Sequence, residues 1–90
     1  MSTVKLKYRG RLAVLTGISE ESFECGKLKS TNNIEGILIL IRERHGQEAE
    51  KAARAMLIAV NGESIHLLKQ FKTVIKEGDE VSFFPLCAGG

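Results

Sequence analysis

The amino-acid sequence predicts a single α+β domain in which one main helix packs across one face of a β-sheet. Ninety residues can build only one modest core, because a chain of this size buries about 60–65% of the surface it exposes when unfolded. Residues 4–9 alternate apolar and basic side chains, which is the period of a half-buried strand. Residues 34–41 instead repeat their apolar side chains at helical spacing. The expected order is strand, strand, helix, strand, strand.

The composition excludes several classes of protein. It is 43% hydrophobic and 27% charged, as in ordinary globular proteins. Thirteen Lys and Arg against eleven acids leave a net charge of +2, too even to indicate a nucleic-acid partner or an anionic membrane. Apolar runs such as residues 37–41 fall far short of the ~20 residues that span a membrane. With no apolar signal region and only two cysteines, we expect a cytoplasmic protein.

The first strand is expected over residues 4–8 and a weaker second strand over residues 20–25. Between them, Gly10 and Gly17 bracket a segment that we interpret as a short helical turn or loop. Each strand would turn one apolar face toward a common core.

The clearest element is a helix that ends before Gly46. Asn32 and Glu35 have the spacing of a capping box, which would satisfy free amide groups at its start. Its apolar stripe consists of Ile34, Ile37, Leu38 and Ile41. Basic side chains in its last turn favour the negative end of the helix dipole. Residues 47–54 predict a second helix that is mostly solvated, since only its alanines are apolar.

An apolar strand over residues 56–60 leads into Asn61-Gly62, the strongest short signal for a hairpin turn. The remaining segments are a returning strand over 63–65, irregular turns over 67–75 and a last strand over 80–85. The apolar faces predict one core, made of Val4, Leu6, Tyr8, Ile34, Ile37, Leu38, Ile41, Leu57, Val60, Val81 and Phe83.

Most catalytic constellations are missing from the sequence. The single Asp, Asp79, follows Gly78 and is interpreted as a turn residue. His45 and His66 lack metal-ligand spacing from each other and from a cysteine, so no metal site is expected. His45 is interpreted as a helix C-terminal residue and His66 as a surface residue. We therefore expect no self-contained active site and no bound cofactor.

The C-terminus carries the strongest functional signal. After Pro85 the chain ends Leu86-Cys87-Ala88-Gly89-Gly90, and two terminal glycines occur by chance in about one chain in 200. Five residues extend roughly 17 Å, enough to thread a deep groove, and glycines pass a narrow channel because they lack Cβ atoms. The sequence thus predicts a domain over residues 1–85 and a flexible tail over 86–90. The alternative is an ordinary frayed terminus.

The carboxylate of Gly90 is the least hindered that a chain can present, but a carboxylate is a poor acyl donor. Activation with ATP to an acyl-adenylate would supply a leaving group. A sulfur nucleophile could then displace AMP, which gives a C-terminal thiocarboxylate or thioester. The spacing of the tail permits this chemistry.

The segment Gly78-Asp79-Glu80-Val81-Ser82-Phe83-Phe84-Pro85, with the ending Ala88-Gly89-Gly90, resembles the small subunit of molybdopterin synthase. That family belongs to the ubiquitin-like β-grasp sulfur carriers. The similarity extends over the whole chain, including the helix end at residues 42–46 and the turn at 60–62. It implies a mixed β-grasp sheet in which the first and last strands are parallel neighbours.

The resemblance also implies a function. Gly90 would be adenylated by a ubiquitin-activating-like adenylyltransferase that consumes ATP, and then thiocarboxylated. The tail, whose positions are Leu86, Cys87, Ala88 and Gly89, would insert into the large subunit of molybdopterin synthase. There its sulfur would form the dithiolene of molybdopterin.

Phe84 matches an aromatic residue with which the family docks its partners, and we expect it to be exposed on the face opposite Phe83. Related proteins add apolar residues where this chain has Arg9 and Ser64, so the docking patch should be smaller and more polar. Cys87 is interpreted as a small apolar filler, because nothing nearby in the sequence would lower the pKa of its thiol.

Other functions remain open at this point. One is a sulfur carrier for another pathway, such as thiamin. Another is a ubiquitin-like modifier whose Gly90 forms isopeptide bonds with lysines of other proteins. A third is an interaction module without tail chemistry, in which a tag added after Gly90 would be harmless.

Overall fold

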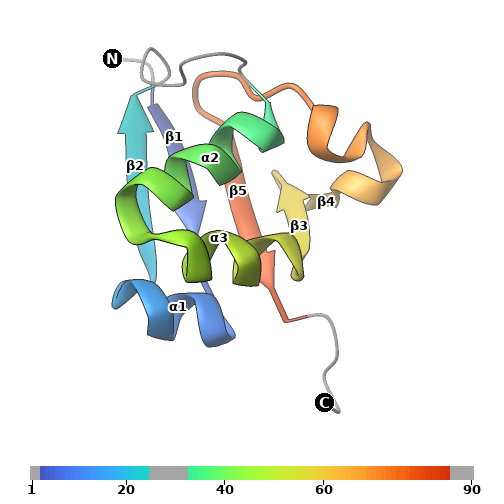
Figure 1. The fold of residues 1–90 in the computed structure, drawn as a ribbon. Helices are drawn as coiled ribbons and strands as arrows, with labels where there is room; N and C mark the ends of the chain where they lie inside the picture. Colours follow the sequence, from blue (N-terminus) through green and yellow to red (C-terminus); the bar gives the residue numbers. More distant parts are fainter. Residues whose placement is uncertain (1–2, 25–32, 86–90) are drawn as a thin grey trace.

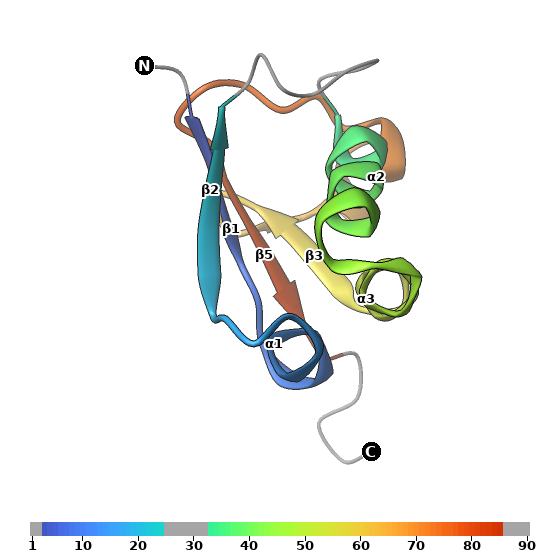
Figure 2. The ribbon, with the colours of Figure 1, turned by 60° about the vertical axis from the view of Figure 1, so that its left-hand side comes forward.

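The computed structural model describes residues 3–24 and 33–85, which form a mixed sheet with helices on one face (Figures 1 and 2). Over these residues the strands are β1 (Thr3–Lys7), β2 (Glu20–Glu24), β3 (Leu57–Val60), β4 (Glu63–Ser64) and β5 (Glu80–Phe84). Their spatial order is β2-β1-β5-β3-β4. β1 and β5 are parallel neighbours, and the other pairs are antiparallel. The mixed sheet, the parallel pairing of the first and last strands and the hairpin of β3 with β4 are confirmed, and β5 adds a fifth strand to the expected order of two strands, a helix and two strands.

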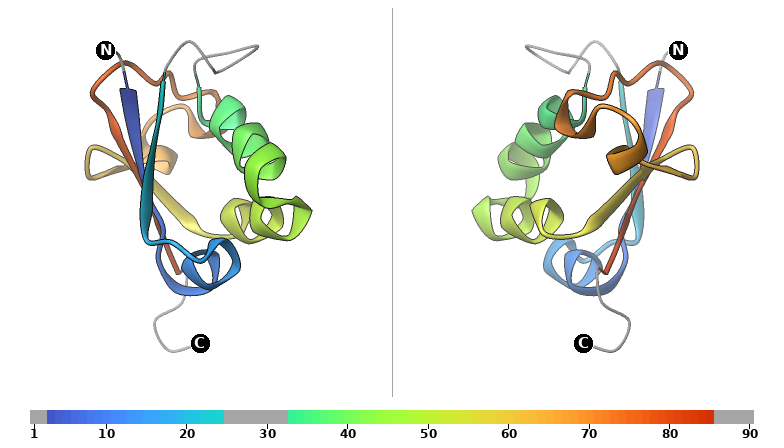
Figure 3. Two further views of the ribbon diagram at one scale, coloured as in Figure 1. Left: turned by 90° about the vertical axis from the view of Figure 1, so that its left-hand side faces the viewer. Right: turned by 90° about the vertical axis from the view of Figure 1, so that its right-hand side faces the viewer.

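The helices are α1 (Gly10–Thr16), α2 (Ile34–His45) and α3 (Gln47–Arg54), with short 3₁₀ turns η2 (Ile65–Leu67) and η3 (Gln70–Lys72). Edge-on views show α2 and α3 on one side of the sheet and α1 at the end where β5 finishes (Figure 3). The segment that we interpreted as a short helical turn or loop is the seven-residue helix α1, which ends where Gly17 adopts φ 78°. The other face of the sheet carries no helix of the described residues.

The start of α2 corrects the predicted cap. The N-cap is Asn33, whose side chain accepts a hydrogen bond from the amide of Gly36 at 3.0 Å. Asn32 lies outside the described residues. The predicted capping partner, Glu35, instead receives a bidentate pair of hydrogen bonds from Arg54 at the end of α3. The Glu35 carboxylate is therefore engaged in a long-range ion pair with Arg54 and not in a capping box.

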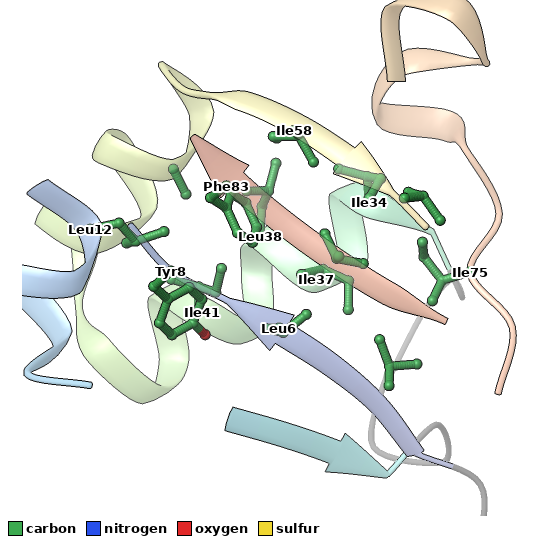
Figure 4. Close-up of a cluster of buried hydrophobic side chains, with 14 of the residues drawn as sticks. Leu6, Tyr8, Leu12, Ile34, Ile37, Leu38, Ile41, Ile58, Ile75 and Phe83 are labelled. Atoms are coloured by element: carbon green, nitrogen blue, oxygen red, sulfur yellow. The ribbon is translucent and has the colours of Figure 1, made fainter. Parts of the chain in front are cut away.

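One contiguous core fills the space between the sheet and the helices (Figure 4). Every predicted core residue is buried except Leu57, which is only half-buried. The inward position of β3 belongs to Ile58, because successive side chains of a strand point to opposite faces. The core also contains residues that the prediction did not include: Leu12, Phe23, Ala49, Ala53, Ile58, Ile65 and Ile75.

The returning strand of the hairpin is shorter than expected. β4 stops at Ser64, and Ile65 begins η2 with its side chain buried in the core. The hydroxyl of Ser64 accepts a hydrogen bond from the amide of His66 at 3.2 Å, which caps η2. Ser64 thus ends the strand because its side chain satisfies the backbone of the next turn.

The two predicted turns are held together by side chains. Asn61 and Gly62 both have positive φ, 52° and 86°, as the hairpin turn requires. The Asn61 side chain accepts from the amide of Glu80 at 2.9 Å and donates to Asp79 Oδ1 at 2.9 Å. Asp79 Oδ2 also accepts from the amide of Lys76 at 2.8 Å. Asp79 is therefore a turn residue, as expected.

Candidate functional site

The end of β5 determines where the C-terminal tail leaves the domain. β5 lies in the centre of the sheet, between β1 and β3, and runs toward α1 (Figure 1). Phe84 is its last residue, and Pro85 is the last residue that the structure describes. The predicted tail positions Leu86, Cys87, Ala88, Gly89 and Gly90 lie outside the described residues. The described part thus places the start of the tail beside α1.

Sequence reasoning missed a residue that fixes this exit. Gly10, the first residue of α1, has φ 59°, and a Cβ built on it would lie 2.9 Å from Cγ of Pro85. Pro85 therefore packs directly on the backbone of α1, in space that only a glycine leaves open. The sequence offered one clue. Gly10 comes shortly after the first strand, which the family resemblance places beside the last strand.

Phe84 lies on the sheet face that carries no helix in the described chain. Val81 and Phe83 point into the core, so Phe84, next in the alternation, points to the opposite face, as predicted. It is half-buried rather than exposed, and the guanidinium of Arg9 lies over its ring at 5.8 Å from the centroid. The strand register places Leu57 directly opposite Phe84 on the same face.

The strand register gives the neighbours of Phe84 on this face. In the register, Ala59 of β3 lies between Ser82 of β5 and Ser64 of β4. The apolar side chains of this face, called here the open-face patch, are the half-buried Leu57 and Phe84 and the buried Ala59, with Arg9 above Phe84. The accessible apolar part of this face is therefore small and lies beside the cation of Arg9.

On the core side, a cluster of polar groups links the end of α2 to the edge strand β2. Glu21 accepts a hydrogen bond from the hydroxyl of Tyr8 and lies 2.7 Å from Nε2 of His45. Arg44 is 4.0 Å from the same carboxylate. Burial, followed by the hydrogen bond to Glu21, raises the pKa of Tyr8 above its usual range. His45 is thus a helix C-terminal residue, as interpreted, but its partner Glu21 was not foreseen.

Residues 3–24 and 33–85 contain neither a cluster of metal ligands nor a membrane-spanning helix. Nowhere in these ranges do three or more His, Cys, Asp or Glu side chains gather so that they could hold a metal ion. Nor does any helix of these ranges have the length and apolar content needed to cross a membrane.

These features define a small domain with a mixed sheet, a parallel pair of terminal strands and a C-terminal extension. Residues 6–90 match the model of the ThiS family, and the chain belongs to this family. A search of curated protein sequences finds no match.

Solved structures with the same fold cover nearly the whole chain. A Pyrococcus furiosus protein described as molybdopterin converting factor subunit 1 is 29% identical, with a TM-score of 0.71 over 94% of this chain and 98% of that one. Small archaeal modifier protein 1 from Methanosarcina acetivorans is 22% identical, with a TM-score of 0.77 over 100% and 98%. The complex of molybdopterin-converting factor subunits 1 and 2 from Helicobacter pylori contains a chain 18% identical, with a TM-score of 0.64 over 98% and 99%. The fold is the ubiquitin-like β-grasp, and the resemblance seen in the sequence is confirmed.

Proposed function

We propose that this protein carries sulfur as a thiocarboxylate on Gly90 and donates it in molybdopterin biosynthesis, as the small subunit of molybdopterin synthase. The observation that carries the proposal is the Gly-Gly ending a few residues after the central strand of a ThiS-family β-grasp domain. The similarity to the Pyrococcus furiosus protein supports the molybdopterin pathway. The cytoplasm is the compartment proposed for it.

The chemistry proceeds in two steps on the terminal carboxylate. A carboxylate oxygen of Gly90 attacks the α-phosphate of ATP, so that pyrophosphate leaves and an acyl-adenylate forms. A sulfide-level nucleophile then attacks the acyl carbon and AMP leaves, which gives the thiocarboxylate. The adenylyltransferase binds ATP and the reacting atoms, so the domain described here contributes recognition and presentation of the chain end.

Two partners are proposed, and both must hold residues 86–90 while the domain stays outside. One is a ubiquitin-activating-like adenylyltransferase. The other is the large synthase subunit, and the Helicobacter pylori structure, a complex of subunits 1 and 2, supports a partner of this kind. The open-face patch around Phe84 is the surface that we assign to docking.

The mass of the intact protein tests this proposal. Incubation with the adenylyltransferase, ATP and a sulfide source should raise the mass by the difference between one sulfur and one oxygen. Adding the large subunit and its pterin substrate should restore the original mass as the sulfur is transferred. A carboxylate that a competent adenylyltransferase leaves untouched would contradict the proposal.

A ubiquitin-like modifier is the second candidate, because the Methanosarcina acetivorans neighbour is a small archaeal modifier protein. A modifier would use the same activated carboxylate but transfer the acyl group to a lysine amine, which releases AMP or a thiol. Mass spectrometry of tryptic peptides separates the two functions, since only the modifier leaves residues 77–90, the segment after Lys76, attached to lysines of other proteins. A carrier for another pathway, such as thiamin, would form the thiocarboxylate but fail to convert the pterin.

A further inference from the structure

A groove lies between α1 and α3, beside the point where β5 ends. Its volume is about 370 Å³, within the range of small ligand pockets. The residues that line it are Arg11 of α1, Glu48, Lys51, Ala52 and Ala55 of the α3 segment, Met56 and Pro85. Its wall is thus mainly aliphatic, and its rim is charged.

The charged groups at the rim are not equivalent. Arg11 and Glu48 face each other at 3.9 Å, and both side chains are largely exposed, so this pair contributes little. The ammonium group of Lys51 makes no ion pair with any residue in the described ranges. The groove therefore presents an aliphatic wall together with one uncompensated cation.

We propose that the C-terminal segment of the same molecule, residues 86–90, is the occupant of this groove when no partner holds it. Pro85 is itself part of the wall, so the segment begins at the groove. Leu86 supplies an aliphatic side chain for the wall of Ala52, Ala55 and Met56. Five residues reach roughly 17 Å, so the Gly90 carboxylate can approach Lys51. The segment thus brings one apolar group and one anion to a site that offers their complements.

Tethering makes this docking effective even if the contact is weak. A short flexible linker holds a ligand near its site at an effective concentration in the millimolar range. A contact of only millimolar affinity would therefore keep a sizeable fraction of the tails in the groove. Such a docked tail would exchange with a free tail, and partners would capture the free form.

This inference goes beyond the proposed function and does not depend on it, since docking needs neither ATP nor a partner. The test compares ¹H–¹⁵N spectra of the full chain and of a chain that ends at Pro85. We expect the amides of Lys51, Ala52, Ala55 and Met56 to shift between the two. In the full chain, the heteronuclear NOE of Leu86 should be clearly higher than in a variant that cannot dock.

Ala52→Glu is that variant, because it places bulk and a carboxylate in the groove. Gln47→Glu is the matched control, because it adds the same charge to the same helix at an exposed position outside the groove. Truncation at Pro85 should then leave the groove amides unchanged in Ala52→Glu but shift them in Gln47→Glu. Lys51→Gln leaves the wall intact and should reduce the chemical-shift changes that truncation causes. This variant provides the test if Ala52→Glu does not fold. The proposal would be overturned if truncation of the natural sequence left the chemical shifts of the groove amides unchanged. It would also be overturned if these shifts changed only when a partner is added.

Discussion

At the scale of single residues, Gly10 and Pro85 set the position from which the tail leaves. Replacing Gly10 with Ala combines a positive φ, which costs about 1–2 kcal/mol for an L-residue, with a Cβ placed 2.9 Å from the proline ring. Gly17→Ala is the matched control, because Gly17 also has positive φ but nothing lies within 4 Å of its added Cβ. Urea unfolding should show a larger loss of stability for Gly10→Ala. Equal losses would mean that the contact with Pro85 is without energetic importance.

Phe84 is the residue whose loss should separate docking from folding. Phe84→Ala removes the largest side chain of the open-face patch, and a buried aromatic anchor at an interface is worth ~2 kcal/mol or more in binding. We expect calorimetry to show this loss of affinity for the adenylyltransferase or the large subunit. Circular dichroism should show a folded protein, since Phe84 faces away from the core.

The control for that measurement is Leu67→Ala, which removes an apolar side chain that is 76% exposed and lies in η2, outside the open-face patch. It should leave binding unchanged. Loss of the fold together with binding in Phe84→Ala would instead assign Phe84 to the structural core.

At the scale of elements, one arginine joins the start of α2 to the end of α3. Arg54 donates to both carboxylate oxygens of Glu35, at 3.0 and 2.6 Å, and also to Glu50 at 2.9 Å. The hydrogen bonds from Arg54 lower the pKa of Glu35. The pair is partly exposed, so solvent screening limits its contribution to less than about 1 kcal/mol.

This shift predicts a dependence of stability on pH. Because the pKa of Glu35 is lower in the folded state, its contribution is present above the ordinary glutamate pKa of about 4.3 and is lost as pH falls below it. Glu35→Gln should therefore lower the Tm at neutral pH, and the difference from the natural sequence should close in acid. Glu43 is an exposed residue on the same helix, and for Glu43→Gln the difference in Tm from the natural sequence should not change in this way with pH. A gap that is constant with pH would show that the ionised pair does not stabilise the fold.

Elements with strong local signals could be predicted from the sequence. The helix over Ile34–His45 has an apolar stripe at helical spacing and a glycine after its end, and both are local properties. The hairpin after β3 is likewise specified by Asn61-Gly62. The candidate tail needed no structure, because its signal is the position of two glycines at the end of the chain.

Features that depend on long-range contacts could not be predicted. Asn32 and Asn33 are both able to cap a helix, and the choice between them depends on the fold. Leu57 and Ile58 lie in a continuous apolar run, which has no alternation to tell the inward residue from the outward one. The pairing of Glu21 with Tyr8 and the contact of Gly10 with Pro85 join residues whose spacing in the sequence carries no signal.

At the scale of the whole molecule, the fold separates stability from presentation of the chain end. The core lies between the sheet and the helices (Figure 4), whereas the open-face patch lies on the opposite face of the sheet and Pro85 lies beside α1. β5 connects the two, since Phe83 is fully buried and Phe84 lies on the other face. The central strand therefore leads from the core to the exposed Pro85, from which the chain continues into residues 86–90.

This separation predicts that changes at the end of the chain affect function without affecting stability. Deleting Gly90, or adding one residue after it, should abolish sulfur transfer, because the reacting carboxylate is then lost or displaced. The Tm should stay nearly unchanged, since the core ends before Pro85. Cys87→Ser should be tolerated, because the transferable sulfur is bonded to the terminal carbonyl carbon. Intact mass after the adenylation reaction and a thermal melt of each variant measure both properties, and sulfur transfer by a chain extended after Gly90 would contradict the assignment of that carboxylate.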